Sequence, residues 1–343
     1  FEHHKSILEE IKERDHILHF PYQSFRYYID MLREAAIDPR VTSIQITLYR
    51  VAKESVVINS LINAAKNGKK VIVVIELQAR FDEEANIYWS NRLQEVGAKV
   101  IHGVPGLKVH CKLTLIERQI NKRIEHFAYI GTGNFHEETT KIYCDEGLFT
   151  FDKRITSDVV KIFEFFEINY KQHIFNHIIL SPFSTRRHFL YHIDHEIKNA
   201  REGKKAYMII KMNSLVDEGM MEKLYEASQA GVRVKLIIRG ICSLKPGVPG
   251  LSENIEAISI VDKFLEHSRI FYFYHGGNEK LYISSADWMV RNLDRRIELT
   301  CPIYDSEVKR ELKQQLKIQL NDNVKARILD DVQDNKYVRN NGK

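Results

Sequence analysis

The chain has 343 residues, 44% of them hydrophobic and 28% charged, which is enough apolar material for two globular domains and too much for a disordered or fibrous protein. Its formal net charge of +5 is a mild excess and implies only that anionic partners are not repelled. We find neither a dense basic stripe nor a recognisable nucleic-acid-binding module, so we expect no nucleic-acid partner.

Helix-like and strand-like segments alternate along the first half of the chain. Apolar spacing that stops at Gly, Asp-Pro or a polar segment predicts helices at 24–36, 55–67, 83–96 and 155–170. Short apolar runs predict strands at 43–49, 71–77, 98–102, 108–116, 126–130 and 142–149. Such alternation predicts an α/β fold with a central sheet.

The same order of elements begins again after a linker around Ser181-Pro182-Phe183-Ser184. Helices are predicted at 188–200 and 217–230, and strands at 206–212 and 232–238. Segment 61–75 can be aligned with segment 224–238, and Leu, Ala, Gly, Val and Ile coincide at corresponding positions. We therefore expect two similar α/β domains, at residues 1–180 and 181–343.

Each half carries a His-x-basic motif, and a second predicted strand then ends in small residues followed by an amide or a carboxylate. The residues that make up the two motifs are His110, Lys112 and the turn Gly131-Thr-Gly-Asn134 in the first half, and His267, Arg269 and the turn Ser284-Ser-Ala-Asp287 in the second. Period-2 alternation predicts that His110 and Lys112 share one face of a strand, as do His267 and Arg269.

The residue types point to phosphoryl chemistry. A neutral imidazole is a good nucleophile near pH 7, and a neighbouring Lys or Arg neutralises phosphoryl oxygens. If the two motifs converge, one histidine attacks the phosphorus while the other orients or protonates the leaving group. One such motif is expected by chance in a chain with 15 histidines, whereas two copies in corresponding places are not. We therefore expect His110 and His267 to be catalytic.

The paired motifs resemble those of the phospholipase D superfamily, and the chain as a whole resembles the two C-terminal domains of bacterial polyphosphate kinases of the long-chain type. The segments that carry this resemblance are Tyr49-Arg50-Val-Ala-Lys, Glu76-Leu-Gln-Ala-Arg80-Phe-Asp-Glu-Glu-Ala, Pro105-Gly-Leu-Lys-Val-His110-Cys-Lys112, Ile130-Gly-Thr-Gly-Asn-Phe, Val234-Lys-Leu-Ile-Ile-Arg239-Gly-Ile-Cys-Ser-Leu, Ala257-Ile-Ser-Ile-Val-Asp and Tyr282-Ile-Ser-Ser-Ala-Asp-Trp-Met-Val-Arg-Asn. The resemblance implies two phospholipase D-like α/β domains packed around a shared active site.

The resemblance also implies an activity, namely reversible transfer of the terminal phosphate of ATP to inorganic polyphosphate through a phosphohistidine. It implies that His110 is phosphorylated and that His267 assists beside the phosphates and the nucleotide. The remaining implied site residues are Tyr143 and Arg239 at the nucleotide, and Arg50 and Arg80 at Mg²⁺ and phosphate, with Lys112, Arg269 and Asn134 as supporting phosphate contacts. Since arginine is not a metal ligand, we interpret Arg50 and Arg80 as anion clamps beside a magnesium phosphate.

For the whole protein, the resemblance implies ATP or ADP, inorganic polyphosphate and Mg²⁺ as partners. It implies a homo-oligomer in the cytoplasm or peripherally at the inner membrane face, and we expect this chain to be its C-terminal part. Two alternatives stay open: a phospholipase D-like phosphodiesterase or nuclease, and a polyanion-binding domain without catalysis. In the phospholipase D pattern Glu117 lies near the usual aspartate, but Tyr274 takes the matching place in the second half, which disfavours phosphodiester hydrolysis.

Overall fold

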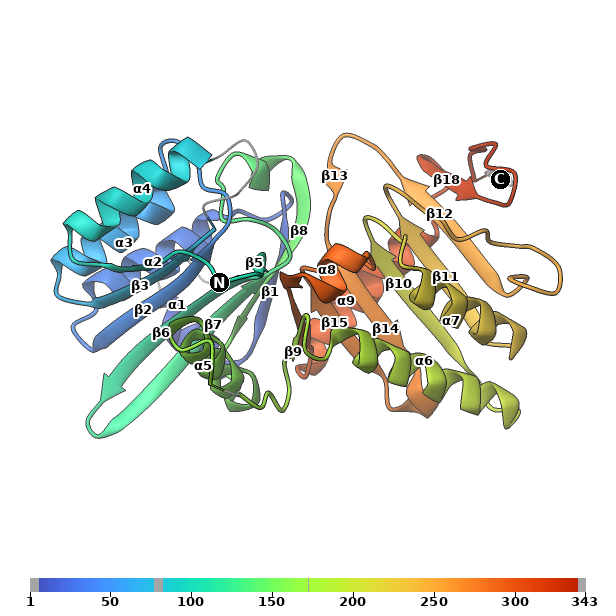
Figure 1. Cartoon of the computed structure of the whole chain (residues 1–343), viewed down its shortest axis with the longest axis horizontal. Coiled ribbons are helices and arrows are strands. Elements are labelled where there is room, and N and C mark those ends of the chain that lie inside the picture. Colours follow the sequence, from blue (N-terminus) through green and yellow to red (C-terminus); the bar gives the residue numbers. More distant parts are fainter. Residues whose placement is uncertain (1–5, 77–82, 172, 339–343) are drawn as a thin grey trace. The chain divides into compact units, whose positions relative to one another are not determined.

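The computed structural model describes residues 6–76, 83–171 and 173–338, and it divides into two compact units, Phe1–Ile178 and Ile179–Lys343 (Figure 1). Arg80, one of the predicted site residues, lies outside the described residues. Within the described ranges, no helix combines the length and apolar character needed to span a bilayer.

The first unit alternates helices and strands, as its sequence predicts. Its elements are α1 (Ile7–Glu13), β1 (His16–Phe20), α2 (Arg26–Ile37), β2 (Val41–Leu48), α3 (Val56–Lys66), β3 (Lys70–Ile75), α4 (Glu83–Glu95), β4 (Lys99–Ile101), β5 (Lys108–Val109), β6 (Lys112–Ile120), β7 (Arg123–Gly131), the short 3-10 helix η1 (Thr139–Lys141), β8 (Tyr143–Thr150) and α5 (Lys153–Glu167).

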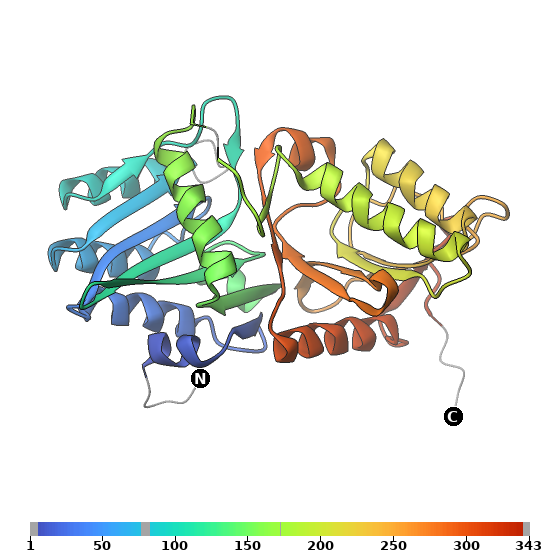
Figure 2. The ribbon, with the colours of Figure 1, turned by 90° about the horizontal axis from the view of Figure 1, so that it is seen from below.

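The sheet of the first unit is mixed, with the order β1-β8-β7-β6-β2-β3-β4. Strands β2, β3 and β4 are parallel neighbours, whereas β6, β7, β8 and β1 extend the sheet in antiparallel fashion from β2. Helices α1 to α4 contribute to one apolar core with alternate residues of the strands, and α5 packs on β6 and β7 across the sheet (Figure 2). This arrangement is the α/β sandwich that the alternating pattern predicts.

The second unit repeats the element order of the first from β1 onward without a counterpart of α4, and it adds one strand at its end, after a helix that corresponds to α5. Its elements are β9 (Ile179–Leu180), α6 (Thr185–Arg201), β10 (Tyr207–Met212), α7 (Glu218–Gln229), β11 (Arg233–Ile238), β12 (Ile255–Ile260), β13 (Leu265–Glu266), β14 (Arg269–Phe273), the 3-10 helix η2 (His275–Gly277), β15 (Lys280–Ser284), α8 (Val290–Asp294), β16 (Arg296–Ile297), β17 (Leu299–Pro302), α9 (Ser306–Leu320) and β18 (Ala326–Leu329).

The second sheet has the order β9-β17-β15-β14-β10-β11-β12-β18, which reproduces the strand order and directions of the first sheet with β18 added. Helices α6 and α7 pack on one face over a core that includes Phe189, Leu224 and Phe271. Helix α9 covers part of the other face (Figure 2). The two units are therefore two copies of one α/β architecture.

The aligned segments form the same structure in both units. Ser55 caps α3 and Asp217 caps α7, each by accepting a hydrogen bond from a main-chain N–H of the first helical turn. Gly68 and Gly231 follow these helices with φ of 78° and 91°, a left-handed conformation in which a side chain is strained. Each glycine then leads into a buried parallel strand, which confirms the predicted repeat.

The predicted strand at 108–116 is interrupted in the structure. Strand β5 ends at Val109 and β6 begins at Lys112, so His110 and Cys111 lie between two strands. The expectation that His110 and Lys112 share a face of one continuous strand is therefore wrong. The same break precedes β14, where His267 and Ser268 lie between β13 and β14.

Candidate active site

His110 lies in the break between β5 and β6 and is half-buried. The edge of its imidazole packs against Tyr49, with ring centroids 4.7 Å apart and an interplanar angle of 81°. The amine of Lys112 and the guanidinium of Arg50 lie 5.5 Å and 6.0 Å from the centroid of the same Tyr49 ring. Two of the predicted cations are therefore gathered around the aromatic ring that contacts His110.

Buried side chains bind the main chain on both sides of His110. The Glu76 carboxylate accepts a hydrogen bond from the N–H of Val109 at 3.1 Å, and Lys112 donates to the carbonyl of His110 itself. Thr47 donates to the carbonyl of Cys111 at 2.7 Å and accepts from the N–H of Leu113 at 3.0 Å. The break in the strand is thus a fixed structure that presents the imidazole.

Asn86 of α4 connects the ends of two strands beneath this loop. Its side-chain amide donates to the carbonyl of Tyr49 at 3.0 Å and to the carbonyl of Glu76 at 2.9 Å, and the residue is only 1% exposed. Tyr49 follows β2 and Glu76 follows β3, so one amide sets the positions of the ring and the carboxylate that contact the His110 segment. These contacts lie at the carboxyl ends of parallel strands, where ligands bind in α/β sheets.

The turn after β7 lies at the same edge of the sheet, because Gly131 pairs with Lys112 in the antiparallel register. Thr132 donates to Asp145 at 2.6 Å, and a Cβ on Gly133 would lie 2.0 Å from an oxygen of that carboxylate. Only glycine therefore fits at 133. The Oδ1 atom of Asn134 is buried and has no hydrogen-bond partner among the described residues.

Tyr143 and Arg50 also belong to this edge. Tyr143 begins β8, which pairs with β7 through Gly147 and Gly131 and extends from there toward the turn. Arg50 follows Tyr49 after the end of β2. The first unit thus brings Arg50, Lys112, Asn134 and Tyr143 to the edge that carries His110.

His267 occupies the position in the second unit that corresponds to His110 in the first, and Arg269 contacts it twice. The Arg269 guanidinium donates to the carbonyl of His267 at 2.7 Å and approaches its Nε2 atom at 3.2 Å. Because arginine is always protonated and only donates, this contact requires a lone pair on Nε2. The arrangement therefore fits a neutral His267 with its proton on Nδ1.

Asp287 anchors Arg269 from the turn after β15. Its two oxygens accept from Arg269 at 3.1 Å each, and one also accepts from the main-chain N–H of Asn213 at 2.8 Å. Burial acts to raise the pKa of Asp287, but Arg269 and these hydrogen bonds outweigh it and lower the pKa to about 2. Asp287 is thus an anion at neutral pH that orients the cation beside His267.

Asn213 connects these groups and was not predicted from the sequence. Its side-chain nitrogen donates to the carbonyl of His267 at 3.0 Å, and its oxygen accepts from Arg239 at 2.8 and 3.0 Å. Arg239 also donates to the carbonyl of Glu266 at 2.7 Å. The structure therefore brings the predicted residues Arg239, Arg269 and His267 into one network through Asn213.

A buried lysine binds the residues on both sides of His267. Lys211 donates to the carboxylate of Glu266 at 2.6 Å and to the hydroxyl of Ser268 at 2.8 Å. Gln319 of α9 donates to the same Glu266 carboxylate at 2.8 Å. As in the first unit, the main chain around the histidine is fixed by side chains from neighbouring elements.

Glu117 does not lie beside His110. It is in β6, where it pairs with His126 of β7 at 3.4 Å, and the hydrogen bond from His126 lowers the pKa of its carboxyl against the effect of burial. At about 3.3 Å of rise per residue, Glu117 is roughly 17 Å along the strand from Lys112. The Glu117 carboxylate is thus paired with His126, along β6 from the break that carries His110.

The described residues contain no group of three or more His, Cys, Asp or Glu side chains that could bind a metal ion. Mg²⁺ does not require such a cage, since it is commonly bound by one or two protein oxygens, water and substrate phosphates. The Oδ1 atom of Asn134 is buried and has no hydrogen-bond partner among the described residues, and an amide oxygen of this kind can bind Mg²⁺.

Two sequence signals could have found the missing residues. Asn213 follows the predicted strand 206–212 at its carboxyl end, the same place that singled out Arg50 and Arg239, and Glu76 is a charged residue near the carboxyl end of the predicted strand 71–77. Thr47 is a polar residue within a buried strand, and it is 1% exposed. A buried polar group needs a partner, which marks such positions as structurally constrained.

Comparison with known proteins assigns each unit to a protein family. Residues 6–172 match the profile described as polyphosphate kinase C-terminal domain 1, and residues 178–343 match polyphosphate kinase C-terminal domain 2. The polyphosphate kinase of Vibrio cholerae is 49% identical over 338 residues, which cover 98% of this chain and 48% of the relative. That of Escherichia coli K12 is 49% identical over 330 residues, 96% of this chain and 48% of the relative.

Solved structures give the same assignment. The crystal structure of polyphosphate kinase from Porphyromonas gingivalis matches 99% of this chain and 52% of its own, with a TM-score of 0.93 and 41% identity. Phosphatidylserine synthase of Haemophilus influenzae matches 94% of this chain and 91% of its own with a TM-score of 0.59 at 10% identity, which shows a shared fold alone. The chain spans about half the length of the curated relatives it matches, and its two halves belong to the families of polyphosphate kinase C-terminal domains 1 and 2.

Proposed function

We propose that the enzyme to which this chain belongs transfers the terminal phosphate of ATP reversibly to inorganic polyphosphate, with His110 as the covalent carrier. The observation that carries the proposal is the fixed main chain around a half-exposed imidazole. Glu76, Lys112 and Thr47 bind the residues before, at and after His110. Such positioning favours a nucleophile, because phosphoryl transfer depends on orientation and charge more than on other covalent machinery.

The reaction consists of two displacements at one phosphorus. An imidazole nitrogen of His110 attacks the terminal phosphorus of ATP, a nitrogen–phosphorus bond forms, and the bond to the bridging oxygen breaks with release of ADP. A terminal oxygen of polyphosphate then attacks the same phosphorus, and the nitrogen–phosphorus bond breaks to return free imidazole. No net oxidation occurs, and each step is reversible, so polymer and ADP give ATP by the same route.

Cations near His110 would stabilise the charge on the transferred group. We assign Arg50 and Arg80 to the phosphate oxygens, and Lys112 to the field around the imidazole, since its amine lies beside Tyr49 and binds the His110 carbonyl. Mg²⁺ would enter with the nucleotide and neutralise phosphate charge there, with the Asn134 oxygen as one protein donor.

In the second unit we assign His267 to assist the transfer. We assign Arg239 of the second unit and Tyr143 of the first unit to nucleotide binding. A neutral His267 with its proton on Nδ1 can donate a hydrogen bond to a phosphate oxygen, while Arg269 occupies its Nε2 side. Arg269 would contribute positive charge to bound phosphate and, through Asp287, orient the ring.

The partners and location of the whole enzyme belong to the same proposal. We infer ATP or ADP and inorganic polyphosphate as its substrates, a homo-oligomer as its assembly, and the cytoplasm or the inner membrane face as its place. Light scattering on the full-length enzyme measures the assembly, and a single-chain mass would contradict it.

Product analysis tests the activity. Full-length enzyme with ATP and Mg²⁺ should form acid-insoluble polymer and ADP, and the reverse reaction should form ATP from polymer and ADP. His110→Ala should abolish both, whereas His126→Ala, a histidine of the same hairpin that pairs with Glu117, should retain them. Cleavage of lipid or nucleic acid without metal, in place of polymer synthesis, would support the hydrolase and overturn the proposal.

A further inference from the structure

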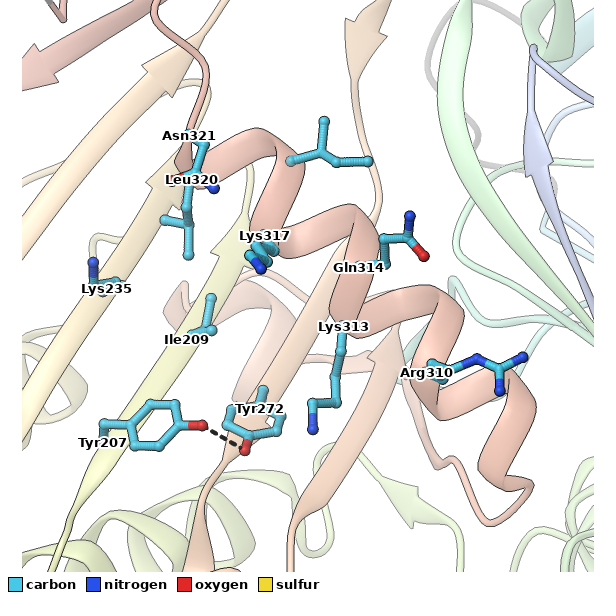
Figure 3. A pocket seen from close by; sticks show the side chains of 11 residues that line it. Tyr207, Ile209, Lys235, Tyr272, Arg310, Lys313, Gln314, Lys317, Leu320 and Asn321 are labelled. Carbon is cyan, nitrogen blue, oxygen red and sulfur yellow. Dashed lines mark hydrogen bonds between the residues drawn. The ribbon is translucent and has the colours of Figure 1, made fainter.

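A cavity of about 980 Å³ lies within the second unit between α9 and the sheet (Figure 3). We call it the α9 pocket. Helix α9 lines one side of it, and strands β10, β11 and β14 line the other. The side chains that carry its chemistry are Arg310, Lys313 and Lys317 from the helix and Tyr207, Lys235 and Tyr272 from the strands.

The pocket lining has four cations and no carboxylate. Arg310, Lys313 and Lys317 follow one another at helical spacing, so their side chains line the same face of α9. Glu307 pairs with Arg310, Glu279 with Lys313 and Glu256 with Lys235 from outside the lining, while the exposed Lys317 forms no ion pair with the described residues. The surface is therefore suited to an anion.

The sheet side of the pocket is aromatic. The rings of Tyr207 and Tyr272 have centroids 5.5 Å apart, and their hydroxyl groups are 2.9 Å apart. The amine of Lys313 lies 5.6 Å from the centre of the Tyr272 ring, so cation and ring are neighbours within the pocket (Figure 3). Ile209 and Ile318 add aliphatic surface to the lining. Tyr272 is only 1% exposed, so Tyr207 and Ile209, which are half-buried, supply the surface that the sheet side offers to a flat apolar group.

We propose that the α9 pocket is a second nucleotide site, which binds a nucleoside diphosphate or triphosphate. The base would contact the tyrosine side, and the phosphates would lie along Arg310, Lys313 and Lys317. An inorganic phosphate chain would use the cations but leave the aromatic and aliphatic lining without a function, which is why a nucleotide fits the whole pocket better.

The pocket is distinct from the residues assigned to the proposed active site. Arg269 and Phe271 alternate with Tyr272 along β14, and Phe271 packs under α6 on the opposite face from α9. The pocket lining includes none of His267, Arg239 and Arg269. The inference therefore adds a site to the proposed function and does not depend on His110.

Counting bound nucleotide on the full-length enzyme tests the inference. Equilibrium dialysis with labelled ADP should show two molecules per chain. Lys317→Glu and Arg310→Glu, both on the exposed surface, should each weaken one site by roughly 10- to 100-fold. Lys325→Glu, an equally exposed lysine outside the lining, should leave both sites unchanged.

The active-site assignment is checked in the same assay with Arg239→Ala, which should remove the other site. If one ADP binds and only Lys317→Glu removes it, the α9 pocket stands and the nucleotide role of Arg239 falls. If ADP binding is the same in wild type, Lys317→Glu and Arg310→Glu, the inference is overturned. It is also overturned if these two variants lose affinity for inorganic polyphosphate while keeping both ADP sites.

Discussion

Glu76 and Arg239 occupy equivalent positions after β3 and β11, and each binds the main chain of the residue that precedes a motif histidine. Glu76 accepts from the N–H of Val109 at 3.1 Å, whereas Arg239 donates to the carbonyl of Glu266 at 2.7 Å. The two copies of the fold thus use side chains of opposite charge at one place, because the loops present opposite backbone groups to them.

Removal of the Glu76 carboxylate should disturb catalysis more than folding. Glu76→Ala leaves the N–H of Val109 without its acceptor and frees the segment before His110. Since small displacements of a reacting group are costly, we expect the rate of His110 phosphorylation to fall on the order of 100-fold. Glu76→Gln retains an acceptor oxygen and should lose much less. Rapid-quench labelling measures both, and equal rates for Glu76→Ala and wild type would refute the positioning role.

Asn213 should be important for activity beyond its contribution to stability. Asn213→Ala removes the side-chain bonds to the His267 carbonyl, to Asp287 and to Arg239, keeps the main-chain bond to Asp287, and should cost about 1–3 kcal/mol of unfolding free energy. Asn254→Ala, which loses a bond to the Ser228 carbonyl away from the motif, is the matched control. Urea unfolding and polymer synthesis together test this. Equal activity losses in the two variants would reduce Asn213 to a structural residue.

Gly133 should not tolerate a side chain. A Cβ at this position would lie 2.0 Å from an Asp145 oxygen, so Gly133→Ala must move the turn that carries Asn134. Gly219→Ala is the control, because its Cβ would meet nothing closer than 3.7 Å and lies in α7, where alanine favours the helix. We expect Gly133→Ala to lower polymer synthesis at least tenfold and Gly219→Ala to leave it unchanged. Full activity in Gly133→Ala would show that the turn adapts.

The stability of the second unit should fall in mild acid because buried histidines must take up protons. Burial lowers the pKa of His188 to about 4 and that of His192 to about 3, against an ordinary value of 6.5. From pH 6.5 down to about 4 the unfolded chain therefore binds more protons, and the free energy of unfolding decreases.

Glu196 gives the unfolding free energy the opposite dependence on pH. Burial raises the pKa of Glu196 to about 7, and its contribution to stability is lost as the pH rises through that value. Urea titrations between pH 4 and 7.5 should give a flatter acid decline for His192→Gln and a steeper one for Glu196→Gln. Identical pH profiles for the two variants would contradict these titrations.

The architecture could be predicted from the sequence because it depends on local patterns. The Leu61–Ile75 and Leu224–Ile238 segments repeat a helix, a glycine and a buried strand, and the structure forms each as predicted. The histidine motifs could also be recognised in the sequence, since His110 and His267 each lie two residues before a basic residue.

The supporting contacts could not be predicted because they join residues far apart in the chain. Thr47 binds Cys111, and Asn213 binds His267, through backbone groups that no pattern of residue types reveals. The break at His110 could not be predicted either, because segment 108–116 has the residue alternation of a continuous strand. The α9 pocket depends on how a helix packs on a sheet, which spacing along either element does not determine.

Trapping of the phosphorylated enzyme tests the central claim most directly. The full-length protein is mixed with ATP labelled in its terminal phosphate, quenched in base, digested and mapped by mass spectrometry. We expect acid-labile, base-stable phosphate on the peptide that contains His110, and none in His110→Ala. Label on a different residue, or undiminished label in His110→Ala, would contradict it.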